Sequence, residues 1–236
     1  MSFYERRILL RSKDVDMHRR LRTSVLFELL QEAAITHTEE LGMGREKTLD
    51  RGFLWVVTMQ RAEITRMPVY DERVTLRSWP GETMHVFFPR HYSLTDERGE
   101  PLIRANALWM LVDQNTRRMI FPDRCGIVIE GTETGEELAL PSAPARLPVT
   151  QESSFVVPYS YVDLNGHMNN TRYFDLMEDS LPAAAEGKRL REVTAEYSSE
   201  VRLGDKLQIR WGEQEGRYYL EGALEKPCFR MALRYE

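Results

Sequence analysis

The chain has 236 residues, 42% of them hydrophobic and 29% charged, which is enough to bury one large core or two small ones. This composition excludes a disordered chain, and a net charge of −5 argues against a general affinity for nucleic acid. No stretch approaches the roughly 20 apolar residues of a membrane-spanning helix, so no membrane span is expected.

The N-terminus and the two cysteines bear on location. The opening stretch, MSFYERRILLRSKD, lacks the apolar core of a signal peptide, although a transit peptide removed beforehand would leave no trace. Cys125 and Cys228 have neither metal-type spacing nor a disulfide framework. The sequence therefore predicts a protein of a reducing, cytoplasmic compartment.

The first half of the chain reads as a strand, a helix and then more strands. YERRILLR suits a short strand, and residues 24–42 suit a helix with an apolar stripe (Val25, Leu29, Leu30, Ala33 and Ala34) that stops at Gly42. RVTLRSW, HVFFPRHYSLTD and IRANALWMLVD then carry the alternating, β-branched and aromatic residues of strands, and DERGE suits a hairpin connection.

The second half repeats this order. SSFVVPYSY is a predicted strand, TRYFDLMEDSL a helix that Pro182 ends or kinks, and KLQIRWGEQEGRYYLEGAL and CFRMALRYE are strands. The proline-rich stretch EELALPSAPARLPVT between the halves has the composition of an extended linker. We therefore expect units at 1–135 and 151–236, joined by a linker at 136–150.

Two alignments within the chain indicate a duplication. DMHRRLRTSVLFELL, from Asp16, aligns without a gap to DLNGHMNNTRYFDLM, from Asp163. Further on, EITRMPVYDERVTLRSW, from Glu63, aligns with EYSSEVRLGDKLQIRW, from Glu196, with one residue of slip near the final Trp. A helix followed by antiparallel strands, present twice, predicts an α+β fold in which two sheets meet edge to edge with a helix packed on each.

The copies differ in the polar segment VDLNGHMNN at residues 162–170. Asn165 aligns with His18, His167 with Arg20, Asn169 with Arg22, and Glu200 with Met67. An Asn-Gly turn or a helix cap would explain the polarity, but a purely structural turn would suit the first copy equally. The difference favours one active site in the second copy.

The chemistry of these residues suits hydrolysis. A histidine can move protons near neutral pH, a carboxylate can orient it or activate water, and the N-terminus of the following helix attracts developing negative charge. No serine or cysteine carries a nucleophile signature, so water is the expected attacking group. One histidine with one aspartate lacks the usual ligand set of a metal site, and no cofactor is expected.

VDLNGHMNNTRYFDLMED followed by TAEYSSEV resembles the catalytic half of the acyl-acyl carrier protein (acyl-ACP) thioesterases, which comprise the plant Fat-type enzymes and bacterial relatives. LLQEAAITHTEELG and GFLWVVTMQRAEITRMPVYDERVTLRSW resemble that family's N-terminal half. The resemblance implies a tandem hotdog fold and hydrolysis of fatty acyl-ACP. The shorter D-x-N-G-H-x-N-N piece also resembles hotdog hydrolases of acyl-coenzyme A.

The resemblance implies four catalytic residues: Asp163, Asn165, His167 and Glu200. It makes Glu200 the general base or water-positioning group and His167 a proton carrier. Asn165 then holds the carbonyl or the water, Asp163 orients its neighbours, and backbone donors around Gly166–Asn169 complete an oxyanion site. Each has a structural alternative, with Asp163 as a turn residue, Glu200 as an exposed strand carboxylate and His167 as a core histidine.

Three positions depart from the family pattern. The family has a cysteine after the glutamate, where this chain has Val201, and two basic residues where it has Ser198 and Ser199. The first departure rules out cysteine chemistry at that position.

The resemblance also assigns the acyl pocket to the first half. Trp55, Met59, Met84, Trp109 and Met110 could line it, although ordinary core positions explain most of them. Arg117 and Arg118 could meet an acidic carrier protein, but a solvated surface pair is the simpler interpretation. The alternatives to an acyl-ACP hydrolase are an acyl-coenzyme A thioesterase and a non-catalytic acyl-binding protein. Either a monomer or a homodimer is compatible with the repeat.

Overall fold

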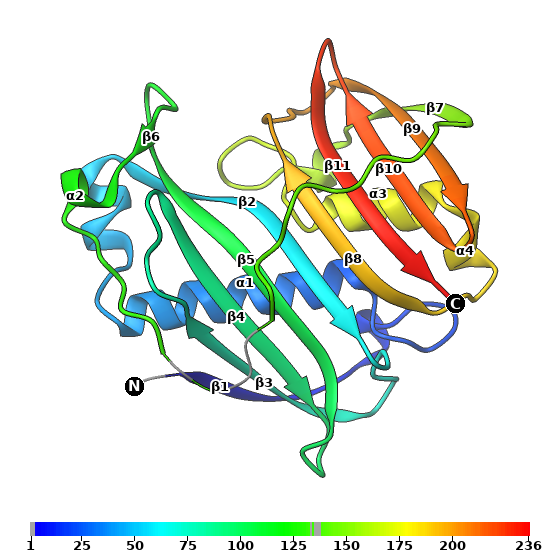
Figure 1. Ribbon diagram of the computed structural model, residues 1–236, viewed down its shortest axis with the longest axis horizontal. Coiled ribbons are helices and arrows are strands. Elements are labelled where there is room, and N and C mark those ends of the chain that lie inside the picture. The colour runs from blue at the N-terminus through cyan, green and yellow to red at the C-terminus, as the bar shows by residue number, and fades with distance from the viewer. Residues whose placement is uncertain (1–2, 133, 135–137) are drawn as a thin grey trace.

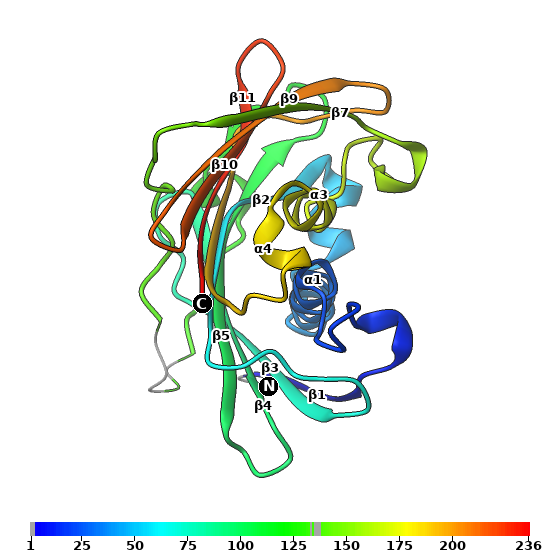
Figure 2. The same ribbon diagram turned by 90° about the vertical axis from the view of Figure 1, so that its right-hand side faces the viewer.

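In the computed structural model, which describes residues 3–132, 134 and 138–236, the strands form one antiparallel sheet with the helices packed on one face (Figures 1 and 2). The strand order is β1-β3-β4-β5-β2-β8-β11-β10-β9-β7, with β6 added to β5. This arrangement confirms the predicted α+β class. The predicted boundary between residues 135 and 136 lies outside the described residues.

The first half supplies one long helix and the strands on one side of the β2–β8 junction. Its elements are β1 (Tyr4–Leu9), α1 (Thr23–Glu40), β2 (Phe53–Ile64), β3 (Arg73–Pro80), β4 (Phe87–Thr95), β5 (Pro101–Asp113), β6 (Met119–Ile120) and the single turn α2 (Pro122–Cys125). Gly42, just after α1, has a φ of 69°, a left-handed conformation that glycine adopts without strain, as predicted for the helix stop.

The second half repeats the pattern with a shorter helix. Its elements are β7 (Gln151–Val156), α3 (Arg172–Ser180), α4 (Pro182–Ala185), β8 (Leu190–Tyr197), β9 (Lys206–Gln214), β10 (Arg217–Ala223) and β11 (Pro227–Tyr235). Pro182 starts α4 directly after α3, so the predicted break at this proline is confirmed.

Matching backbone contacts confirm both internal alignments. The bridge between Val15 and Leu21 has its counterpart between Val162 and Met168. Likewise, the bridge that joins Arg20 to Val69 corresponds to the one that joins His167 to Arg202. In the second pair of bridges, Arg20 corresponds to His167 by the shift of the first alignment, and Val69 corresponds to Arg202 by the shift of the second alignment. The second shift also relates Met67 to Glu200, so these two residues occupy equivalent places in the two halves.

The two halves meet at β2 and β8, which lie side by side in the middle of the sheet (Figure 1). Met59 to Glu63 pair antiparallel with Glu196 to Glu192. The sequence predicts an edge-to-edge junction, but the two strands that form it are not evident from their residues. Their charged residues obscure the alternation of a strand: Arg61 forms an ion pair with Glu63 on β2 and another with Glu192 across the junction, both at 2.8 Å.

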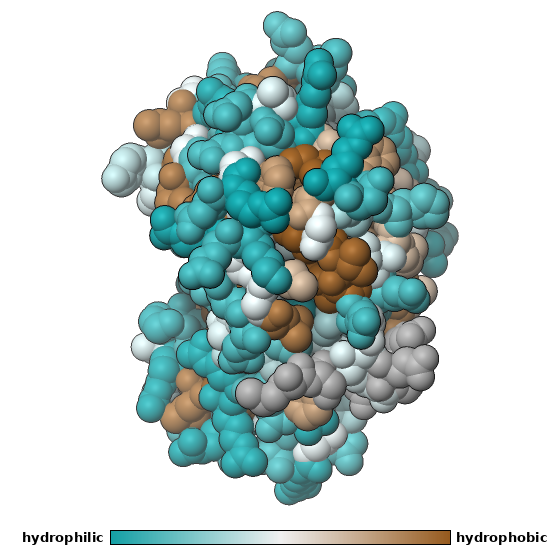
Figure 3. Space-filling model, turned by 90° about the vertical axis from the view of Figure 1, so that its left-hand side faces the viewer, coloured by the Kyte–Doolittle hydropathy of each residue, from teal (hydrophilic) through white to brown (hydrophobic). Residues whose placement is uncertain are grey.

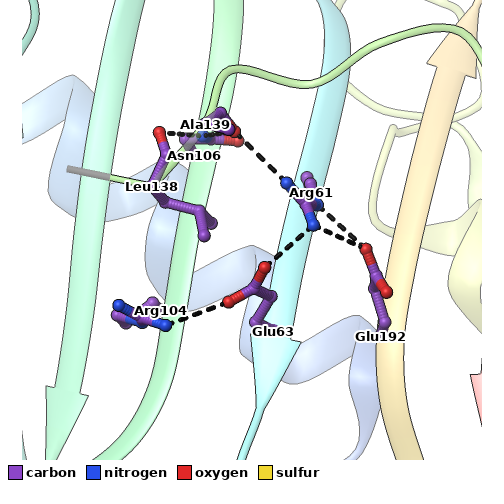
Figure 4. Close-up of polar contacts among 7 residues, drawn as sticks. All are labelled: Arg61, Glu63, Arg104, Asn106, Leu138, Ala139 and Glu192. Atoms are coloured by element: carbon purple, nitrogen blue, oxygen red, sulfur yellow. Dashed lines mark hydrogen bonds and ion pairs between the residues drawn. The ribbon is translucent and has the colours of Figure 1, made fainter.

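Residues 138–150, which lead into the second half, cross the sheet on the face opposite the helices (Figure 2). The side-chain amide of Asn106 on β5 donates to the carbonyls of Leu138 and Ala139, at 3.2 and 2.8 Å (Figure 4). Residues 138–150 contain no helix or strand, as expected for an extended connection.

The buried face of α1 differs from the predicted stripe. Leu30, Ala33 and Ala34 are buried as expected, but Val25 and Leu29 are only half-buried, whereas Leu26 and Phe27 are almost fully covered. The reason is that α1 packs on both the sheet and α3, where Phe27 stacks on Phe174. Because α3 also covers α1, the buried face of α1 differs from the apolar face that helical periodicity predicts.

Candidate active site

Asp163 and Asp16 shape the same turn in the two halves. The Asp163 carboxylate accepts the N–H of Asn165 at 2.8 Å, and the Asp16 carboxylate accepts the N–H of His18 at 2.9 Å. The N–H of Asp163 donates to His167 O, as that of Asp16 donates to Arg20 O. The contact of the Asp163 side chain is therefore a turn contact that the first half also makes.

A left-handed residue completes each turn. Gly166 has a φ of 79°, and its equivalent Arg19 has a φ of 64°. The Asn-Gly pair in the second half thus eases a conformation that the first half adopts with a larger side chain. The fold needs this turn in both halves, but it does not need Asn165 or His167 to make it.

His167 and Glu200 come together in the second half. His167 Nε2 lies 2.9 Å from Glu200 Oε2, while 14% of the His167 side chain and 38% of the Glu200 side chain remain exposed. His167 is held by its bridge to Arg202, and Glu200 follows the end of β8. When Glu200 is ionised, this contact keeps the histidine proton on Nε2.

Asn165 lies at the exposed tip of the turn that carries His167. Its backbone is fixed by Asp163, whereas its side-chain amide faces solvent. Three of the four predicted residues, Asp163, Asn165 and His167, therefore share one loop, and Glu200 joins them through His167.

Arg117, for which a solvated surface position is the simpler expectation, contacts Glu200. Its Nε lies 3.4 Å from Glu200 Oε1, on the opposite side of the carboxylate from His167. It belongs to the turn between β5 and β6, so the first half contributes a charge to a site on the second. Its φ of 57° is uncommon for a residue with a side chain. Arg202 lies further from Glu200, at 3.7 Å.

The backbone donors assigned to the oxyanion site are largely occupied, which corrects that expectation. The N–H groups of Gly166, Met168 and Asn169 donate to the carbonyls of Asp163, Val201 and Tyr161, at 2.7 to 3.0 Å. The Asn169 side chain accepts the N–H and hydroxyl of Thr171 at the start of α3. The Asn169 side chain therefore has a structural contact, whereas the Asn165 residue is exposed.

In the first half, the residue equivalent to His167 contacts the backbone of a second-half loop. Arg20 Nη1 donates to the carbonyls of Gly187 and Lys188, both at 3.1 Å. A Cβ added to Gly187 would lie 3.1 Å from the His18 ring, so this segment packs closely on the first turn. Gly187 has a φ of 75°.

Comparison with known proteins follows the same division into halves. A model of the acyl-ACP thioesterase N-terminal domain matches residues 2–122, and one of the C-terminal domain matches residues 145–224. The chain belongs to the acyl-ACP thioesterase family.

Plant relatives of this thioesterase-family chain include an acyl-[acyl-carrier-protein] hydrolase of chloroplasts from Cuphea viscosissima, 28% identical over 84% of the chain and 52% of the relative. A chloroplast palmitoyl-acyl carrier protein thioesterase from Arabidopsis thaliana is 23% identical over 84% of the chain and 52% of its own length. The chain spans about half the length of the curated relatives it matches.

Solved structures confirm the tandem hotdog fold. A crystal structure of an acyl-ACP thioesterase from Bacteroides thetaiotaomicron superposes with a TM-score of 0.85 at 24% identity, covering 100% of this chain and 98% of that one. The 12:0-ACP thioesterase of Umbellularia californica superposes with a TM-score of 0.84 at 18% identity, covering 100% and 98%.

The cysteines of this family member are poorly suited to nucleophilic attack. Cys125 and Cys228 are both buried, and burial raises the pKa of the Cys228 thiol. The Val201 side chain beside Glu200 is completely buried. Across the described residues, no group of three or more histidine, cysteine, aspartate or glutamate side chains could hold a metal ion.

An apolar cavity lies between α1 and the sheet of the first half, where the family resemblance places the acyl pocket. Its volume is about 210 Å³. Of the five residues considered for its lining, Trp55 and Trp109 line it, whereas Met59, Met84 and Met110 do not.

Within the described part of the chain, no helix is long and apolar enough to cross a membrane.

Proposed function

We propose that this protein hydrolyses fatty acyl-ACP thioesters to free fatty acid and carrier protein. The observation that carries the proposal is the contact between His167 and Glu200, because the equivalent positions in the first half hold Arg20 and Met67. An acyl-binding protein has no use for a histidine–carboxylate pair of this kind. Family membership and the plant relatives named as acyl-ACP hydrolases support the substrate class.

In the proposed reaction, water attacks the thioester carbonyl. Glu200 orients the water and accepts its proton as the new C–O bond forms. The exposed Asn165 amide donates a hydrogen bond to the carbonyl oxygen, on which negative charge develops. His167 gives its Nε2 proton to the sulfur as the C–S bond breaks, and Glu200 passes the proton that it took from water to the same nitrogen. Asp163 has a positioning role, since it fixes the turn on which Asn165 and His167 stand.

The remaining assignments belong to the same proposal. We assign residues 1–135 to the acyl-pocket half and 151–236 to the catalytic half, joined by 136–150. The partner is an acyl carrier protein bearing a fatty acyl-phosphopantetheine, and the role is in cytoplasmic fatty acid synthesis. One chain already contains two paired hotdog units, which supports a functional monomer, with a homodimer as the alternative.

The test is release of free fatty acid from a panel of acyl-ACPs, with matched acyl-coenzyme A substrates in parallel. We expect faster turnover of the carrier-protein substrates and loss of turnover in Glu200→Gln. Faster turnover of coenzyme A esters would replace the proposal with an acyl-coenzyme A thioesterase. Binding of acyl ligand without hydrolysis of either would leave a binding protein.

A further inference from the structure

The cavity between α1 and the sheet has apolar walls and opens at the surface. Its walls include the rings of Trp55, Phe88 and Trp109. Ile35 and Leu49, which also line it, are 47% and 37% exposed, and they mark where it reaches solvent. Figure 3 shows apolar surface gathered near the middle of one end of the molecule and framed by hydrophilic side chains. Such walls suit a hydrocarbon chain.

Three charged residues line the cavity: Glu39 and Arg45 are exposed at its rim, and Arg90 is buried. Arg90, on β4, lines the cavity although only 4% of it is exposed. Its Nε donates to the Ser78 hydroxyl at 2.9 Å, and its Nη2 donates to the carbonyl of Ala34 at 3.3 Å. Ala34 belongs to α1 and lines the cavity too, so the guanidinium lies in the layer between helix and sheet that the cavity occupies.

Arg90 lacks a carboxylate partner in the part of the chain that the structure describes. A guanidinium has five N–H donors, and the two contacts to Ser78 and Ala34 use two of them. Burial lowers the pKa of Arg90 to about 10, with Tyr92 acting in the opposite direction, so the group is charged at neutral pH. A buried charge with neutral partners alone is destabilising.

The second half shows that the fold does not require this arginine. Arg90 pairs with Pro80 at the end of β3. The shift in numbering that relates Val69 to Arg202 takes Pro80 to Glu213 on β9, which pairs with Tyr218 on β10. Tyr218 is buried among aromatic rings, 5.5 Å from Tyr235 between ring centroids. An aromatic side chain therefore fills the equivalent position in a closely related packing environment.

We propose that Arg90 binds an oxygen acceptor at the far end of the acyl chain, so that the substrate is an acyl thioester with an oxygenated distal end. A carboxylate or a hydroxyl supplies the acceptor that the guanidinium lacks, while the methylenes contact Trp55, Phe88 and Trp109. The inference rests on the proposed function, because it takes this cavity as the acyl pocket.

The test compares pantetheine thioesters of one chain length that end in methyl, hydroxyl or carboxylate. Binding is measured in Glu200→Gln protein by tryptophan fluorescence, since Trp55 and Trp109 line the cavity. Turnover of the same acyl groups on carrier protein is measured with the otherwise unaltered chain. We expect the oxygenated chains to bind about 10- to 100-fold more tightly than the methyl-ended chain, as for a hydrogen bond to a charged group.

Three variants make the test specific. Arg90→Met should remove the preference or reverse it, and Arg90→Lys should retain part of it. Arg104→Met is the matched control, because Arg104 is exposed and pairs with Glu63 outside the cavity. A preference for carboxylate over hydroxyl would identify an anionic end, and equal preference would identify a neutral oxygen; both support the proposal.

Equal or tighter binding of the methyl-ended chain by protein that retains Arg90 would overturn the inference, whatever the variants do. Selective binding without turnover of any substrate would overturn the proposed function and leave this inference standing. Turnover of methyl-ended substrates alone would overturn this inference and leave the proposed function standing.

Discussion

Phe27 and Phe174 stack face to face, with ring centroids 3.9 Å apart and planes within 3°. The internal alignment pairs the same two residues, so each half places an equivalent phenylalanine on its helix and the two rings meet where α1 crosses α3. Both rings are almost fully buried, at 1% and 0% exposure. This contact is a shared element of the helix–helix interface between the halves.

Replacing either ring should therefore destabilise the whole chain. We expect Phe27→Ala and Phe174→Ala each to lower the free energy of unfolding by about 3–5 kcal/mol, as for other buried phenylalanines. The double variant should lose less than the sum, by about 1 kcal/mol, because the second truncation removes a ring whose partner is already gone. Urea denaturation measures all three, and strict additivity would contradict a direct ring–ring interaction.

The repeat also supplies controls for catalysis. His167→Ala should lower kcat by about 10²–10⁴, the usual range for losing a group that transfers protons. Arg20→Ala changes the equivalent residue of the first half, which lies away from the His167–Glu200 pair and contacts the 187–188 backbone. It should lower thermal stability while leaving kcat unchanged. Steady-state rates with one acyl-ACP measure both, and equal losses of kcat would contradict a single site in the second half.

Sequence analysis located the loop of the site but not all of its surroundings. The internal alignment correctly related His167 to Arg20 and Glu200 to Met67, because these positions are fixed by local turns that both halves retain. It could not find Arg117, which reaches Glu200 only because β5 and β6 bring a first-half turn beside the second half. Three of the expected oxyanion donors, the N–H groups of Gly166, Met168 and Asn169, are occupied by backbone carbonyls of the turn and of the segments beside it.

Arg117 should influence catalysis more than stability. The ion pair with Glu200 is partly exposed, with 39% of the Arg117 side chain accessible, so Arg117→Met should change the free energy of unfolding by less than about 1 kcal/mol. It should lower kcat by about tenfold with little change in KM, because the carboxylate loses the contact that holds its second oxygen. Arg117→Lys should recover part of the rate.

The comparison variant for Arg117 is Arg202→Met. Arg202 is 67% exposed and lies 3.7 Å from the same carboxylate, so we expect a smaller effect on kcat. An increase in KM with unchanged kcat for Arg117→Met would instead assign this residue to binding of the carrier protein. Equal losses of kcat for the two variants would show that net charge near Glu200 matters and that the position of Arg117 does not.

Glu178 links the two halves and should make stability depend on pH. Its Oε1 accepts hydrogen bonds from the hydroxyl and the N–H of Thr23, the first residue of α1, at 2.5 and 3.3 Å. Burial raises the pKa of Glu178, and the two Thr23 contacts oppose that shift. The folded state therefore holds this proton more tightly than the unfolded state does.

The sign of the pH effect follows from that difference. Between the ordinary glutamate pKa of about 4.3 and the raised value in the folded protein, the folded state binds more protons. The free energy of unfolding should consequently fall as pH rises through this window. Glu178→Gln should abolish this fall, because glutamine keeps the acceptor oxygen for Thr23 and does not titrate; the aligned residue of the first half, Gln31, already has that chemistry.

Urea denaturation across that pH range, on the unaltered chain and on Glu178→Gln, gives the difference directly. Glu225→Gln, at an exposed position, controls for the loss of a negative charge. Parallel pH profiles for the unaltered chain and Glu178→Gln would contradict a proton bound at this contact. Glu178→Ala should be destabilising at every pH, by about 1–3 kcal/mol, because it leaves the Thr23 donors at the start of α1 without their acceptor.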